Sequence, residues 1–179
     1  MVDRRPIVGV MGSHDESHTT RARQLGEWIA REGYHLLTGG GPGVMEAVTR
    51  AFVAVTPRRG LAIGIVPSAA ARGQPPKGYP NASVEVPVYT HLDHLGRDGD
   101  QAASRNHINV LTARAVVILP GGEGTASEAR LALHYGRPVI AYLDRRADVP
   151  GLPRDVTIES QFDRIQDFVR DACRREASR

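Results

Sequence analysis

The sequence has little cysteine, few aromatic residues and no long apolar segment, and each shortage excludes a class of protein. Its 179 residues include one cysteine, Cys173, so neither an internal disulfide nor a cluster of cysteine ligands can form. No apolar run approaches the roughly 20 residues that span a bilayer, and the short apolar stretch near the N-terminus lacks a signal-peptide cleavage site. We therefore expect a cytoplasmic protein that does not associate with membranes.

The charge balance is slightly basic but is not typical of a nucleic-acid-binding protein. Lysine and arginine total 23 against 20 acidic residues, a net charge of +3, and Lys77 is the single lysine. Basic and acidic residues alternate along the chain, and aromatic residues make up only 5% of it, which leaves few side chains for base stacking. We expect a small-molecule partner rather than a nucleic acid.

Short apolar segments alternate with longer amphipathic ones over most of the chain. This alternation predicts an α/β fold, a Rossmann-like doubly wound parallel sheet with helices on both faces. We expect a single domain over residues 1–179, with a core at 6–143 and a C-terminal helix at about 160–175. Ligands of such folds bind where the strands end. The predicted strands are 6–11, 34–38, 61–66, 84–88, 115–119 and 138–143, and the other predicted helices are 19–31, 44–55, 100–113 and 125–135.

The segment from Gly121 to Thr125 lies between a predicted strand and a predicted helix. Its three glycines allow a sharp turn and a close approach of a ligand, and Thr125 adds a hydroxyl group. The start of the following helix offers unpaired N–H groups and a positive dipole end, which together attract anions. No lysine follows the last glycine, so this is not a P-loop. The segment predicts a phosphate site.

A second glycine-rich turn, from Gly39 to Gly43, also connects a strand to a helix. It has two interpretations: a second anion cradle, or a place where two loops pack closely. Because it accompanies the turn at 121–125, we favour a shared phosphate or nucleotide pocket.

Two charged residues, Arg105 and Glu128, complete the predicted pocket. Arg105 could contact a phosphate through two hydrogen bonds, or could be an ordinary solvated helix residue. Glu128 is expected in the first turn of its helix, where a carboxylate favours the helix dipole but repels a bound phosphate. Glu128 should therefore face a neutral part of the ligand, such as ribose hydroxyls.

The segment 67–81 is rich in proline and glycine and is too long for a simple connection, so we interpret it as a wall of the pocket.

His91, Asp93 and His94 lack the spacing of a metal site, and we expect no metal. Ser13 and His14 follow the first strand without the order of a hydrolase triad.

These motifs resemble the Lonely Guy (LOG) superfamily, long mislabelled as lysine decarboxylases. The resemblance rests on segments 7–13, 37–45 and 64–67, on Arg105-Asn106, and on Pro-Gly-Gly-Glu-Gly-Thr-Ala-Ser-Glu at 120–128. It implies a Rossmann-like fold, a homodimer or higher homo-oligomer, and no required cofactor. The ligand-binding residues that it and the motifs above imply are Gly12, Ser13, Gly39, Gly40, Gly41, Gly43, Met45, Pro67, Arg105, Asn106, Gly121, Gly122, Glu123, Gly124, Thr125 and Glu128.

Two branches of the superfamily compete. Phosphoribohydrolases cleave a nucleoside 5′-monophosphate into free base and ribose 5-phosphate, whereas molybdenum-cofactor carriers bind without catalysis. Asn106 after Arg105, Glu123 between the glycines, and the short distance from Glu128 to Arg137-Pro138 all resemble the carriers.

The favoured hypothesis is therefore a carrier-like binder of a phosphate-bearing ligand, either the molybdenum cofactor or a nucleoside monophosphate. The alternative is a phosphoribohydrolase, not a lysine decarboxylase, with Arg105 and Glu128 as its catalytic residues. A third hypothesis is a nucleotide sensor or scaffold.

Overall fold

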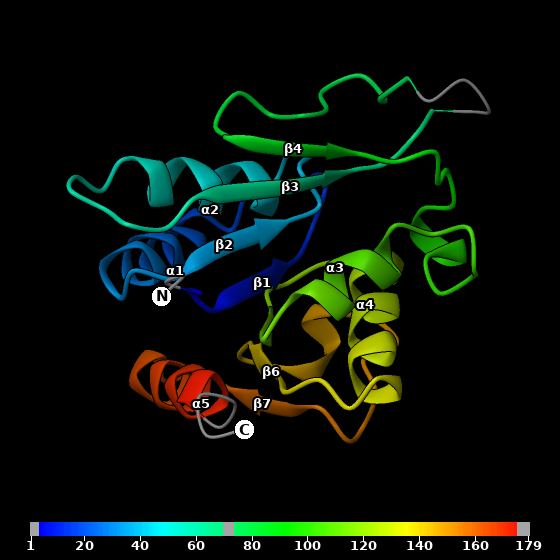
Figure 1. Cartoon of the computed structure of the whole chain (residues 1–179). Helices are drawn as coiled ribbons and strands as arrows, with labels where there is room; N and C mark the ends of the chain where they lie inside the picture. Colours follow the sequence, from blue (N-terminus) through cyan, green and yellow to red (C-terminus); the bar gives the residue numbers. More distant parts are fainter. Residues whose placement is uncertain (1–3, 70–73, 175–179) are drawn as a thin grey trace.

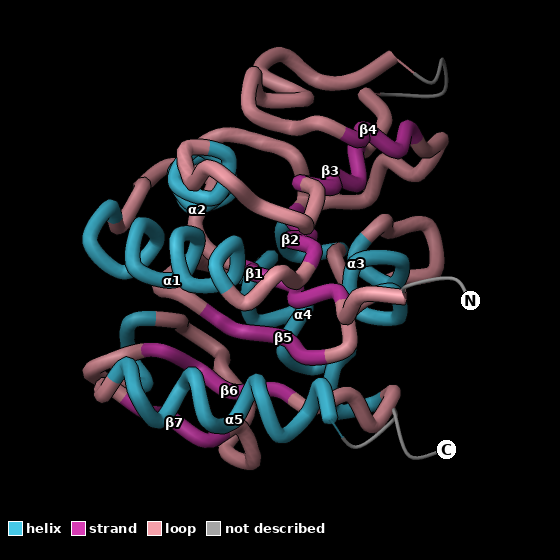
Figure 2. Tube along the Cα trace, turned by 60° about the vertical axis from the view of Figure 1, so that its left-hand side comes forward, coloured by secondary structure: helices cyan, strands magenta, loops and turns pink. Residues whose placement is uncertain are grey.

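The computed structural model describes residues 4–69 and 74–174 and consists of one seven-stranded sheet between two layers of helices (Figures 1 and 2). The strands are β1 (Ile7–Met11), β2 (His35–Thr38), β3 (Ala62–Val66), β4 (Val86–Tyr89), β5 (Ala115–Ile118), β6 (Val139–Tyr142) and β7 (Thr157–Glu159). The helices are α1 (Thr19–Arg31), α2 (Val44–Val53), α3 (Asn106–Thr112), α4 (Glu123–His134) and α5 (Phe162–Arg174), with short 3₁₀ turns η2 (Gly96–Asp98) and η3 (Arg146–Asp148).

All the strands are parallel, in the order β4-β3-β2-β1-β5-β6-β7. The chain first builds outward from β1 to β4 and then returns to place β5 on the other side of β1, where Val10 pairs with Val117. The direction of winding therefore reverses between β1 and β5. This reversal is the position where doubly wound folds bind their ligands, and it confirms the predicted fold class.

The central strands are buried on both faces, and alternate residues enter two separate cores. On β5, Val117 packs with α1, α2 and α5, while Val116 and Ile118 pack with α3 and α4. The views in Figures 1 and 2 show the same division, with α1, α2 and α5 on one face and α3 and α4 on the other. Burial on both faces explains the continuous apolar composition of these strands.

Most element boundaries lie within two residues of the predicted ones, including α4, which begins at Glu123 rather than at 125; the larger differences concern β7 and α3. The strand expected at 84–88 is β4 at 86–89, and β7 was not predicted because only three residues pair with β6. The helix expected at 100–113 begins at Asn106. Before it, the amides of Gln101 and Ser104 bond to the carbonyls of Asp98 and Gln101, at 3.1 and 2.9 Å, and these turns replace the first helical turns. The predicted end of the last helix, residue 175, lies outside the described residues.

Among the described residues, no helix is both long enough and apolar enough to cross a membrane.

Candidate functional site

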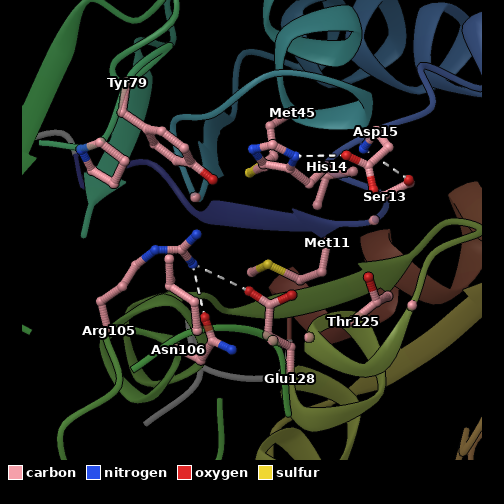
Figure 3. A pocket seen from close by; sticks show the side chains of 18 of the residues that line it. Met11, Ser13, His14, Asp15, Met45, Tyr79, Arg105, Asn106, Thr125 and Glu128 are labelled. Carbon is pink, nitrogen blue, oxygen red and sulfur yellow. Dashed lines mark hydrogen bonds and ion pairs between the residues drawn. The ribbon is translucent and has the colours of Figure 1, made fainter. Parts of the chain in front are cut away.

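A cavity of about 430 Å³ lies at the carboxyl ends of β1 and β2, beside the first turns of α3 and α4 (Figure 3). The structure brings ten of the predicted residues to its wall, and residues that were not in that set complete it. The predicted lining residues are Gly12, Ser13, Gly39, Met45, Arg105, Asn106, Gly122, Gly124, Thr125 and Glu128.

The loop after β1 is held in place by backbone and hydroxyl contacts. The amide of Ser13 donates to the carbonyl of Pro120 at 2.9 Å, which ties this loop to the one after β5. The hydroxyl of Ser13 accepts from the amides of Asp15 and Glu16 at 3.1 and 3.0 Å. Ser13 therefore shapes the loop, and its hydroxyl proton is left to donate to a ligand.

The N-terminus of α4 forms one wall of the cavity. Gly122 is its N-cap residue, and no side chain caps the first turn. The first N–H groups of an α-helix have no acceptor within the helix, so Gly122, Gly124 and Thr125 offer donors and a positive dipole end to the cavity. Glu123 lies elsewhere, with its carboxylate 3.4 Å from Nε of Arg97. At position 121, a Cβ atom would clash with Thr125 Oγ1, so only glycine fits there.

Arg105 is a buried cation of the site, and it is only 5% exposed. Its Nη1 donates to Asn106 Oδ1 at 2.8 Å and lies 3.6 Å from Glu128 Oε1. Nε has no hydrogen-bond partner within the described chain. Because Arg105 also lines the cavity, its guanidinium is suited to an acceptor on a ligand.

Glu128 faces Arg105 from α4, 7% exposed, and lies in the second turn of the helix rather than the predicted first turn. Asn109 Nδ2 donates to Glu128 Oε1 at 2.8 Å and fixes the carboxyl group. Burial raises the pKa of Glu128 above its ordinary value, and Arg105 and Asn109 oppose this shift. The protonated form is therefore favoured more than in water.

The glycine-rich turn at 39–43 is largely filled by other parts of the protein. The guanidinium of Arg105 lies against Gly39, and the ring of Tyr79 lies against Gly41. Gly43 has a φ of +68° and contacts the carbonyls of Ser13 and His14. These contacts correspond to the packing interpretation of the turn. Gly40, Gly41 and Gly43 do not line the cavity, nor does the buried Pro67.

The segment 67–81, which we interpret from the sequence as a wall of the pocket, contributes one side of the cavity through its second half. Pro76, Lys77 and Tyr79 line the cavity, while residues 70–73 lie outside the described part. Asn81 anchors the segment, because its amide donates to Gly40 O and its Nδ2 to Gly41 O, both at 2.8 Å. The contact of this segment with the glycine turn could not be inferred from spacing.

His14 and Asp15 line the cavity opposite Arg105 and Glu128 (Figure 3). His14 Nδ1 lies 3.0 Å from Asp15 Oδ1, and the imidazole stacks with the ring of Tyr79 at 6.0 Å between centroids. Together with Met11 and Met45, these rings give the cavity a face that suits a flat heterocycle. Among the described residues, no group of three or more histidine, cysteine or acidic side chains is placed to hold a metal ion.

The fold and the cavity define a Rossmann-like protein with a cavity at the switch in strand order, where such folds bind their ligands. The model of the SLOG cluster4 family, which is LOG-like, matches residues 5–166, and the chain belongs to this family. An uncharacterized protein of Archaeoglobus fulgidus is 31% identical over 134 residues, covering 74% of this chain and 76% of that protein.

The solved structures that are similar over nearly the whole chain include two proteins named for the molybdenum cofactor. The molybdenum cofactor binding protein of Rippkaea orientalis is 31% identical with a TM-score of 0.70, and the match covers 95% of this chain and 98% of that one. The molybdenum cofactor carrier protein of Chlamydomonas reinhardtii is 28% identical with a TM-score of 0.68, covering 94% and 98%. The predicted resemblance to the carrier branch is thus confirmed.

Proposed function

We propose that this protein binds a phosphate-bearing, nucleotide-like ligand and acts as a carrier of the molybdenum cofactor. The observation that carries the proposal is the meeting of the uncapped N-terminus of α4 with the buried guanidinium of Arg105 at one cavity. The similarity to two proteins named for this cofactor supports the choice of ligand.

The residues present fit the chemistry of the cofactor, which combines a pterin ring system with a phosphate. The N–H groups at Gly122 and Gly124 suit the phosphate, and the guanidinium of Arg105, which lines the same cavity, supplies further donors. Met11, Met45 and Tyr79 suit the flat rings. The cofactor is cargo in this proposal, so the residues bind and shield it and catalyse no step.

The test measures protection of the cofactor. Cofactor released from a molybdoenzyme is incubated with this protein, and the cofactor still able to activate a cofactor-free molybdoenzyme is assayed over time. The wild type is expected to extend the lifetime of the active cofactor, and Arg105→Ala is expected to lose that effect. Equal decay with and without the wild-type protein would contradict the proposal.

A second candidate function, phosphoribohydrolase activity, is favoured by one specific observation: Asn109 and Arg105 fix the buried carboxyl group of Glu128 inside the cavity. In this reaction water cleaves the N-glycosidic bond of a nucleoside 5′-monophosphate. Arg105 would anchor the ribose phosphate, and Glu128 would contact the ribose hydroxyls to stabilise the oxocarbenium-like transition state, or would activate the water.

The hydrolase candidate is tested by incubating the protein with adenosine 5′-monophosphate and separating the products by chromatography. Release of free adenine by the wild type, lost in Glu128→Gln, would establish the hydrolase and replace the carrier proposal. Binding of the nucleotide without release would support the carrier.

We also propose that the chain self-associates. The edge strand β4 supports this proposal, because Val86, Val88 and Tyr89 are all exposed on it. Light scattering on the purified protein is expected to give a multiple of the 19.4 kDa chain mass, reduced by Val88→Asp. A monomeric wild type would contradict it.

A further inference from the structure

A second cavity, of about 560 Å³, lies directly beside the first. Its walls are the loops that follow β1, β5 and β6, and it shares Ser13, Asp15 and Gly122 with the first cavity. The two cavities therefore meet at the N-terminus of α4. The function proposed above uses only the first of them.

The charges around the second cavity do not form a phosphate site. Arg21 Nη2 lies 2.6 Å from Asp144 Oδ1, and Arg145 Nη2 lies 3.2 Å from Asp148 Oδ1. His18, the third basic group in its lining, lies 3.4 Å from Glu16. Each basic side chain of this lining thus already faces a carboxylate.

The carboxylates, in contrast, keep acceptor capacity for a ligand. The side chains of Glu16 and Asp144 are 75% and 64% exposed, and each carboxylate has more lone pairs than the basic side chain paired with it uses. Carboxylates accept hydrogen bonds from the hydroxyl groups of a sugar, and an acidic residue performs this role for ribose in many dinucleotide-binding folds. The second cavity therefore suits an uncharged group rich in hydroxyls.

The position of the two cavities matches the topology of the sheet. Both cavities touch the loops that follow β1 and β5, between which the winding reverses; the first extends from there towards β2 and the second towards β6. In doubly wound folds, a ligand with two halves joined by phosphates lies across this crevice, with the phosphates at a helix N-terminus. Gly122 holds the corresponding place here.

We propose that the ligand has two ends and occupies both cavities. Its heterocycle lies in the first cavity, its bridging phosphate group lies at the N-terminus of α4, and a sugar or nucleoside end lies in the second. The inference rests on the proposed phosphate site. A terminal phosphate would lie beside the carboxylates of Asp15 and Glu16, which would repel it. A bridging phosphate carries less negative charge, and the sugar attached to it would place its hydroxyl groups beside these carboxylates. The ligand class is a dinucleotide-like molecule.

The experiment compares three probes by isothermal titration calorimetry at one ionic strength: AMP, ADP and ADP-ribose. ADP adds a phosphate to AMP, and ADP-ribose adds a further sugar. The wild type is expected to bind ADP-ribose about tenfold more tightly than ADP, the equivalent of one to two hydrogen bonds. Glu16→Ala should lower the affinity for ADP-ribose several-fold, whereas the affinity for AMP should not fall, because the variant removes a negative charge near the terminal phosphate. Asp163→Ala, which removes an exposed carboxylate at the start of α5, is the matched control.

The outcomes separate this inference from the proposed function. Equal affinity for ADP and ADP-ribose, with AMP binding still lost in Arg105→Ala, overturns the two-ended ligand and leaves the proposed phosphate site intact. An unchanged affinity for ADP-ribose in Glu16→Ala also overturns it. Absence of binding by all three probes overturns this inference, while the protection assay decides separately on the carrier function.

Discussion

The guanidinium of Arg105 lies in the space that a side chain at position 39 would occupy. A residue at the end of β2 is thus restricted to glycine by a cation that precedes α3. The absence of a side chain at Gly39 lets Arg105 reach Asn106 and Glu128 at the cavity wall. Gly39 therefore leaves room for the guanidinium of Arg105 in addition to forming the turn.

Gly39→Ala is expected to destabilise the protein by about 1–3 kcal/mol, because the new methyl group forces Arg105 out of its buried place. Urea denaturation measures the loss, and calorimetry with AMP should show weaker binding. Unchanged stability would mean that Arg105 relocates without cost.

Gly122→Ala is expected to separate binding from stability. A Cβ at Gly122 has no neighbour within 4 Å, and its φ of −105° suits alanine, so the free energy of unfolding should change little. The methyl group nevertheless enters the space where a phosphate approaches α4, and affinity for AMP should fall. Normal affinity in this variant would argue against the phosphate site.

Glu128→Gln is expected to reduce the dependence of stability on pH. Because burial raises the pKa of Glu128, the folded state holds the proton more tightly than the unfolded state. The tighter binding of this proton adds to the free energy of unfolding. That stabilisation is fully present below the ordinary pKa of a glutamate and is lost as the pH rises through the raised pKa of Glu128. Urea denaturation from acidic to neutral pH should show a shallower decline in the variant. Parallel curves would indicate an unperturbed carboxyl group.

Tyr79→Ala should weaken the binding of AMP about tenfold or more, because the ring of Tyr79 forms a flat wall of the cavity beside His14. Tyr79→Phe keeps the ring and is the matched control. If both variants bind AMP as tightly as the wild type, the ring does not contact the ligand.

Cys173 is expected to resist thiol reagents in the folded protein. Burial raises the pKa of its thiol to about 11, so almost no thiolate exists at pH 8. The reaction with a chromogenic disulfide should be slow at that pH and fast after unfolding in guanidinium. Fast reaction of the native protein would show that the C-terminal part of α5 opens.

The sequence predicted much of the fold and one side of the site. Alternating apolar segments were sufficient for the central strands, because burial on both faces requires continuous apolar residues. The glycines at 121–124 predicted the turn before α4 for a local steric reason. The roles of Tyr79, Asp15 and Asn109 could not be predicted, because each depends on a contact between distant segments. The stack of Tyr79 on His14 and the bond from Asn109 to Glu128 exist only in the folded chain.

The pairing of β1 with β5 also has a consequence for folding. Val10 and Val117 are far apart in sequence, so this pairing closes a long loop and is expected to form late. The amide of Ser13 bonds to Pro120 just beyond these strands, so the wall that joins the two cavities forms only with that pairing. A ligand bound there would slow the opening of the whole domain rather than of one loop, and would resist the stepwise unfolding that exposes chains to proteases.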